Sequence, residues 1–330
     1  MKERVYRADA KQAKLPGELK PRRYWELDFL RGLCVILMVI DHFCYSAYGV
    51  LPQVRDFFGN PGFWSGLSTA ALVYWYNNAR WIAHYVVISL FFILCGISCT
   101  LSHNNALRGL KALGAGLLIT VATYLADRLI GTGVRIYFGV VHMLGSAMLL
   151  FALFDLAGFG LQKLAGLLFK GKRAAKTMTW VRRLLPCSIG VIGLIVFFAI
   201  PLGHFGKNPV SLWINGERLV TQPHTYLFMD YAYDGSAVAK AFLSIFLELK
   251  NGGIGGDDYF GLIPNALMVF VGSGIGTLLY GTRARNFLRP LDGKWNKPVN
   301  FVGHWALLVY LLHQVVIVVF FYAAGWVASL

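Results

Sequence analysis

The fold is decided by residues 27–48, whose sequence reads LDFLRGLCVILMVIDHFCYSAY. The stretch is long enough to cross a bilayer, because about 20 helical residues rising 1.5 Å each span the hydrocarbon core. It nevertheless carries Asp28, Arg31, Asp41 and His42. Charged side chains within a membrane are costly and by default face a bundle interior or a wet cavity. The stretch therefore predicts a first membrane helix with a polar face.

Helical geometry groups these polar residues. Arg31 and His42 are eleven positions apart, which at about 100° per residue brings them to nearly the same azimuth, and Asp28 lies about 40° away. Asp41 is roughly a quarter turn from His42. One face of the helix is therefore polar at both ends and apolar between them.

The composition agrees with a membrane protein. The chain is 57% hydrophobic and 14% charged, whereas a soluble domain has about 25% charged residues. A net charge of +15 in a soluble protein would suggest a nucleic-acid partner, but here the excess of positive charge on cytoplasmic loops explains it and excludes that partner. The five cysteines lie in apolar runs, a pattern that argues against a disulfide framework or a bound metal.

Apolar runs predict an all-α, multi-pass transmembrane helix bundle. Its seven expected spans are residues 27–48, 81–101, 107–130, 137–160, 186–202, 259–280 and 302–327. Of the 31 Lys and Arg residues, 22 fall in segments on the side of the amino terminus and 8 on the opposite side. This asymmetry predicts a cytoplasmic amino terminus and an external carboxyl terminus.

The predicted domain organisation is simple. Residues 1–26 form a basic cytoplasmic tail, and residues 27–330 form one transmembrane domain. Residues 203–258 are an extracytoplasmic insertion between spans five and six, either a lid over a site or a peripheral addition. Within it, Asn215-Gly216 predicts a β-hairpin over 211–220, residues 237–250 predict a short interfacial helix, and the glycines of 251–256 predict a hinge.

Polar groups recur at depth in other spans. His84 begins the second span, His142 lies near the start of the fourth, Asp258 begins the sixth, and His313 is in the middle of the seventh. A single membrane histidine is more often a packing residue, but several in one bundle indicate a shared polar interior, since each buried polar group needs a partner. The Gly272-Ser-Gly-Ile-Gly276 run predicts a helix-packing face.

Five blocks of sequence, in order, resemble the catalytic domain of the heparan-α-glucosaminide N-acetyltransferase family. They are Leu27-Asp-Phe-Leu-Arg-Gly32, Cys95-Gly-Ile-Ser98 with Ser102, Arg108 and Gly109, Phe138-Gly-Val-Val-His-Met-Leu-Gly145, Asp258-Tyr-Phe-Gly-Leu-Ile-Pro264, and Tyr310-Leu-Leu-His-Gln314. The resemblance covers residues 27–320 and implies a membrane acyltransferase. Such an enzyme moves an acetyl group from cytoplasmic acetyl-CoA, or another acyl-CoA, to an amine or hydroxyl of an extracytoplasmic glycan.

The chain departs from the lysosomal members, which acetylate the terminal glucosamine of heparan sulfate. Their catalytic histidine lies in the first non-cytoplasmic loop, whereas residues 49–80 contain no histidine. The position of His42 is asparagine in those enzymes. Either His42 or His84 has taken the role, or the chemistry differs.

The predicted catalytic residues follow from what attack on a thioester requires. A general base near neutral pKa and a donor to the developing oxyanion are needed. We predict that His42 is the base, that Asp41 or Asp258 orients it, and that His84 is the alternative base.

The predicted donor-binding residues are Asp28, Arg31, Arg108, His142 and His313. Arg31 would hold a phosphate of coenzyme A, or else Asp28 and Arg31 simply pair to fix the helix at the interface. His142 and His313 are expected to line the acyl path.

The predicted acceptor-binding residues are Asp258, Tyr259 and Trp64. Membrane lipid is another expected partner, and the sequence also allows a homo-oligomer. The expected location is a bacterial plasma membrane.

Two functions from other classes remain open at this point. A proton-coupled small-solute transporter would use the same histidines and acids as a relay, although no repeat of spans is visible. A non-catalytic membrane scaffold would leave the buried polar groups without a purpose.

Overall fold

The computed structural model describes residues 24–130, 134–168, 171–199 and 287–330 in continuous stretches. Between them it describes 203–208, 211–214, 217–220, 224–229, 233–247, 249 and 258–281. The predicted basic tail and the glycine-rich hinge over 251–256 lie outside the described residues, apart from the last three residues of the tail.

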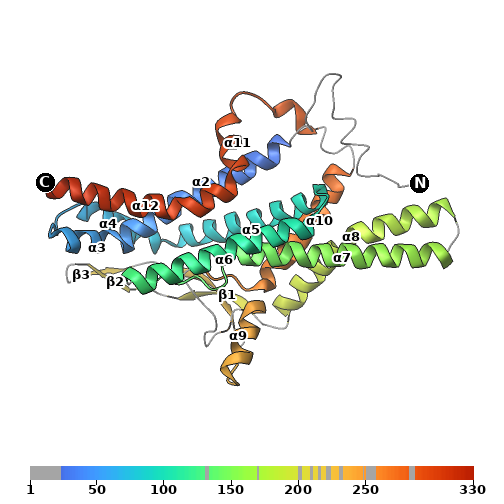
Figure 1. Ribbon diagram of the computed structural model, residues 1–330, viewed down its shortest axis with the longest axis horizontal. Helices are drawn as coiled ribbons and strands as arrows, with labels where there is room; N and C mark the ends of the chain where they lie inside the picture. The colour runs from blue at the N-terminus through green and yellow to red at the C-terminus, as the bar shows by residue number, and fades with distance from the viewer. Residues whose placement is uncertain are drawn as a thin grey trace. The chain divides into compact units, whose positions relative to one another are not determined.

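The described chain is almost entirely helical (Figure 1). The helices are α2 (Trp25–Gly49), α3 (Leu51–Phe58), α4 (Ser65–Trp75), α5 (Asn78–Leu101), α6 (Asn105–Ile130), α7 (Val140–Leu168), α8 (Lys172–Ala199), α9 (Ala237–Phe246), α10 (Leu262–Tyr280), α11 (Lys297–His304) and α12 (Ala306–Ser329). A 3-10 turn, η2, covers Arg289–Leu291. The strands are β1 (Gly203–Asn208), β2 (Ser211–Ile214), β3 (Glu217–Val220) and β4 (His224–Met229).

The predicted multi-pass helical bundle is confirmed. Among the described residues, six helices are long and apolar enough to cross a membrane, and α2 with α3, bent by 41°, makes a seventh if the pair is one span. The fifth span differs from the prediction, which started it at Pro186. Helix α8 begins at Lys172 and contains Pro186 in its interior, because proline is tolerated in membrane helices whose neighbours satisfy the freed backbone groups.

The chain divides into two compact units. The first contains residues 91–204 and 228–291, and the second contains 24–90, 205–227 and 292–330. The predicted boundary between tail and transmembrane domain remains a prediction.

Small residues bring the helices of the first unit together. A methyl group added at Gly272 or Gly276 of α10 would collide with the backbone of α5 at Ile93 or Ile97. Likewise, Gly190 of α8 lies against the backbone of α10. The predicted packing face over Gly272–Gly276 is therefore confirmed, since close backbone approach is what small residues permit in membrane bundles.

In the second unit, α2 and α12 run side by side in the same direction (Figure 1). His42 faces His313, Phe43 faces Phe321, and Gly325 lies against Val54 of α3, so that residue numbers rise together along both helices. Parallel first and last spans are what an odd number of spans requires. The shared core is formed by Ala47, Leu51, Val54, Ala71, Ile317 and Phe321.

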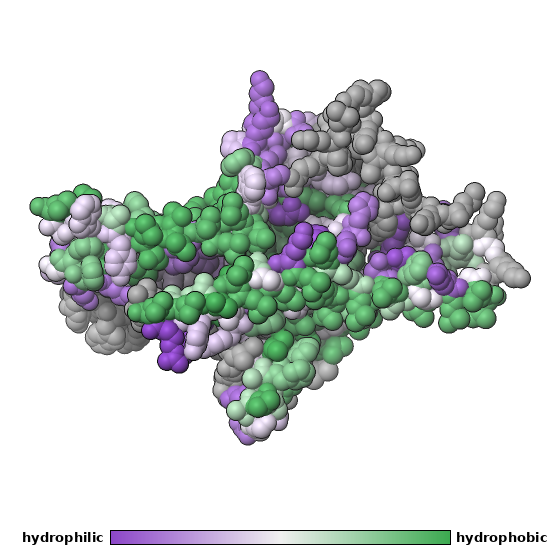
Figure 2. Space-filling model, in the orientation of Figure 1, coloured by the Kyte–Doolittle hydropathy of each residue, from purple (hydrophilic) through white to green (hydrophobic). Residues whose placement is uncertain are grey.

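Large apolar side chains remain exposed along the helices. Val315, Val316 and Val319 of α12 are 60% exposed or more, as are Leu117 and Leu118 of α6. Figure 2 shows this apolar covering on α12 and α6. Surfaces of this extent are unusual on soluble monomers and are satisfied by contact with lipid.

The predicted hairpin is also confirmed. Strands β2 and β3 pair antiparallel with Ser211 opposite Val220 and Ile214 opposite Glu217. Asn215 and Gly216, on which the prediction rested, lie outside the described residues. The predicted helix over 237–250 is present as the shorter α9, which Ser236 caps by accepting a hydrogen bond from the Ala239 amide.

Candidate active site

Two histidine rings from α2 and α12 meet in the second unit. The ring centroids of His42 and His313 are 4.8 Å apart and the planes are nearly perpendicular, at 86°. Nδ1 of His42 donates to the carbonyl oxygen of Met38 at 2.9 Å, and Nδ1 of His313 donates to that of Tyr310 at 2.7 Å. Because a carbonyl oxygen only accepts, each neutral ring carries its proton on Nδ1 and leaves Nε2 as the basic nitrogen.

Gln314, the residue after His313 on α12, makes a second contact with α2. Nε2 of Gln314 donates to Oγ of Ser46 at 2.9 Å, joining residues 268 positions apart. Among the described residues, Nε2 of His313 and Oε1 of Gln314 are buried without a hydrogen-bond partner. Both atoms are acceptors, so the site lacks donors that a hydroxyl or amine could supply.

Asp41 lies on another side of α2 and binds the start of α5. Its Oδ1 accepts from Nε of Arg80 at 2.7 Å, and its Oδ2 accepts from Nη2 of the same residue. The hydroxyl of Tyr74 donates to Oδ1 at 3.1 Å. Burial and the Asp41 carboxylate raise the pKa of Tyr74 to about 12, so Tyr74 remains a donor at neutral pH.

Arg80 and His84 stand one turn apart on α5. The Arg80 guanidinium lies 3.7 Å from the centroid of the Trp75 ring and 4.6 Å from that of Trp81. His84 packs against Trp81 and is close enough to Asp41, Arg80 and His42 to interact with their charges. Four predicted site residues, His42, Asp41, His84 and His313, are thus gathered in one unit.

The carboxylate predicted to orient His42 serves another residue. Asp41 is bound by Arg80 and Tyr74, and the group that fixes the His42 ring is the Met38 carbonyl. The quarter turn between Asp41 and His42 accounts for this, since the two side chains of α2 face different helices.

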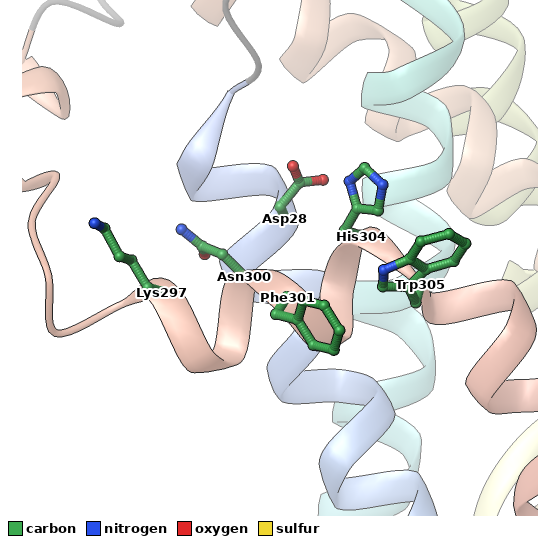
Figure 3. A pocket seen from close by; sticks show the side chains of 6 residues that line it. All are labelled: Asp28, Lys297, Asn300, Phe301, His304 and Trp305. Carbon is green, nitrogen blue, oxygen red and sulfur yellow. The ribbon is translucent and has the colours of Figure 1, made fainter.

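Asp28 and Arg31 form a separate group near the start of α2. Nη1 of Arg31 donates to Oδ1 of Asp28 at 2.9 Å, as the pairing alternative predicted. Asp28 also lines an open pocket of about 410 Å³ (Figure 3), in which its side chain comes from α2 and the others from α11 and the residue after it. The remaining lining residues are Lys297, Asn300, Phe301, His304 and Trp305.

Trp64 is held among aromatic rings of the second unit. It stacks on Phe63 with centroids 4.7 Å apart and contacts Phe320 and Phe321 of α12. Trp64 itself is 40% exposed. An acceptor-binding role for Trp64 remains a prediction.

The other predicted site residues lie in the first unit, where they form hydrogen bonds near the ends of helices. In His142, Nδ1 accepts from the Gly139 amide at 3.2 Å, and Nε2 lies 3.2 Å from Oγ1 of Thr120. Oδ2 of Asp258 accepts from the Val140 amide at the start of α7, a favourable place for a carboxylate. Any contact between Asp258 and His42 remains a prediction.

Tyr259 and Arg108 likewise bind backbone. The Tyr259 hydroxyl donates to the carbonyl oxygens of Ser244 and Leu247 at the end of α9. Nη1 of Arg108 donates to the Ser98 carbonyl and to Oδ1 of Asn105, each at 3.1 Å. Their predicted substrate and donor contacts remain predictions beside these structural roles.

Residues that the sequence analysis did not assign complete the site. Two of them, Arg80 and Tyr74, bind Asp41. The other two, Gln314 of α12 and Ser46 of α2, bind each other. A signal existed for Arg80, which stands immediately before the apolar run that begins at Trp81. Within the described residues no group of three or more His, Cys, Asp or Glu side chains could hold a metal ion.

Fold and site together define a multi-pass helical membrane protein with a half-buried histidine pair and an ion pair, Arg80 with Asp41, in one unit. The sequence model described as heparan-alpha-glucosaminide N-acetyltransferase, catalytic, matches residues 23–192 and 224–315. The chain therefore belongs to this family, which makes it a membrane transferase of the acetyltransferase class. No curated protein and no solved structure matches the chain.

Proposed function

We propose that the protein transfers an acetyl or other short acyl group from cytoplasmic acyl-CoA to a hydroxyl or amine of an extracytoplasmic glycan. The observation that carries the proposal is the histidine pair. Both Nδ1 atoms bond to carbonyls of their own helices, so both Nε2 atoms are left as acceptors. A neutral imidazole held in one tautomer is suited to act as a general base.

His42 is the proposed base. The oxygen or nitrogen of the acceptor forms a bond to the thioester carbonyl carbon while its proton passes to Nε2 of His42. The carbon–sulfur bond then breaks, and the coenzyme A thiolate leaves and takes up a proton. His313, which packs edge-on against His42, would position the acceptor through its own Nε2. His84 is the alternative base.

The donor would enter from the opposite end of α2. Lys297 of the pocket and Arg31, which is paired with Asp28, would offer cations to the phosphates of coenzyme A. Fourteen helical residues from Asp28 to His42 span about 21 Å, a distance of the order of the pantetheine arm. The charge asymmetry of the sequence supports a cytoplasmic position for this pocket and an acceptor that arrives from outside.

The test uses purified protein in detergent with labelled acetyl-CoA and a panel of amino sugars and oligosaccharides. Saturable binding and label transfer to a sugar are expected, and no binding at physiological donor concentrations would overturn the proposal. Lys297→Glu should weaken donor binding, whereas Lys294→Glu, an exposed lysine that does not line the pocket, should not.

The partly buried Asp41–Arg80 pair and the nearby histidines also suit a proton-coupled transporter. Reconstitution in proteoliposomes separates the two functions. Solute or proton flux in the absence of any acetyl transfer would favour the transporter over the transferase.

A further inference from the structure

The guanidinium group of Arg80 is held by more contacts than are needed to neutralise Asp41. Asp41 binds Nε and Nη2, which are two of the three guanidinium nitrogens, through both carboxylate oxygens. Trp75 and Trp81 each lie close to the guanidinium, with ring centroids 3.7 and 4.6 Å from Cζ, an arrangement that favours the cation. The side chain is 3% exposed.

The third guanidinium nitrogen differs from the other two. Nη1 of Arg80 is buried and, within the part of the chain that the structure describes, has no hydrogen-bond partner. A guanidinium group is always charged and only donates. A buried donor on a charged group is costly to leave unpaired, so the expected partner is an oxygen with negative charge that arrives with the substrate.

We propose that Nη1 of Arg80 donates a hydrogen bond to the thioester carbonyl oxygen as it becomes an oxyanion. The proposal rests on the proposed function, because attack on the thioester is what creates this charge. When the acceptor bonds to the carbonyl carbon, the carbonyl π electrons move to oxygen, and Arg80 stabilises that oxygen. When the electrons return, the carbon–sulfur bond breaks and the thiolate leaves.

The position of Arg80 supports this role. Its partner Asp41 immediately precedes His42 on α2, and His84 follows Arg80 by one turn on α5. The Asp41–Arg80 pair therefore holds a donor near His84, the alternative base, which is itself close enough to His42 to interact with its charge. A donor that is already in place does not have to reorganise during the reaction, which is the property that makes such groups effective.

The first experiment compares Arg80→Gln with wild type in the acetyl-transfer assay. For Arg80→Gln we expect kcat to fall about 10²- to 10³-fold, with the Kd for acetyl-CoA unchanged. Arg55→Gln is the matched control, because Arg55 is an arginine of the same unit that contacts Ser68 and should keep wild-type kcat. Retention of kcat within a few-fold in Arg80→Gln overturns the proposal.

A purely structural role is excluded by a second variant. Loss of Arg80 alone leaves the Asp41 charge buried, which can unfold the protein, whereas removing both charges is often nearly neutral. In the double variant Asp41→Asn with Arg80→Gln we expect the melting temperature to return toward that of wild type and kcat to stay low. Recovery of kcat in the double variant overturns the proposal. Absence of transfer by wild type itself refutes the proposed function instead.

Discussion

Replacing His313 by phenylalanine should stabilise the protein while reducing transfer. In the structure, Nε2 of His313 is buried without a partner among the described residues, and Nδ1 bonds to the Tyr310 carbonyl. An unsatisfied buried group costs about 1–3 kcal/mol, and the lost bond is worth about 0.5–1.5 kcal/mol. Because phenylalanine preserves the edge-on contact with His42, the expected net gain is about 0–2 kcal/mol.

His142→Phe is the matched control and should do the opposite. Both ring nitrogens of His142 are in hydrogen-bonding contact, with the Gly139 amide and the Thr120 hydroxyl. Replacing the imidazole by a phenyl ring leaves the buried Gly139 amide unsatisfied, at about 1–3 kcal/mol, and removes the partner of the half-buried Thr120 hydroxyl. Thermal unfolding in detergent measures both variants, and acetyl transfer is assayed in the same preparations. If the two changes destabilise the protein equally, or if His313→Phe leaves transfer unaltered, the unpartnered Nε2 of His313 does not have the role inferred for it.

Three further predictions concern the fold, the ion pair and the topology. Gly96→Val places side-chain carbon within 2.8 Å of the α10 backbone and should cost about 1–3 kcal/mol of stability or more. Gly114→Ala should gain roughly 0.5–1 kcal/mol, because outside its own helix backbone no described atom lies within 4 Å of the added methyl group. Thermal unfolding compares the two variants. The pKa of Tyr74 is raised to about 12, so its contribution to stability should be complete below about pH 10 and be lost as pH rises toward 12, and Tyr74→Phe should flatten this part of the unfolding profile. A cysteine at Ser211 should react with an impermeant maleimide in intact cells and one at Ala174 should not; the reverse pattern would contradict the charge-based orientation.

The sequence was informative where structure is local. Long apolar runs predicted the spans, and Asn215-Gly216 predicted the paired arms of β2 and β3. The bond between Asp28 and Arg31 was one of two alternatives that the sequence left open. Each of these depends on residues near one another in the chain, for which periodicity and propensity are direct guides.

The contacts of the site were beyond such guides. The partner of Asp41 lies 39 residues away on α5, and the contact between Gln314 and Ser46 spans 268 residues. Helical periodicity showed that Asp41 and His42 face different directions, but it carries no information on which helix each one meets. That choice depends on helix packing, where the steric fit of Gly32 of α2 against the α11 backbone is an example.

The central claim is that His42 acts as the base in acyl transfer. The direct measurement is acetyl transfer and acetyl-CoA binding by His42→Ala in one detergent preparation, with His103→Ala, an exposed histidine after α5, as the control. We expect transfer by His42→Ala to fall about 10²- to 10⁴-fold with donor affinity unchanged, and the control to behave as wild type. Transfer by His42→Ala within a few-fold of wild type would contradict the account and pass the role of base to His84.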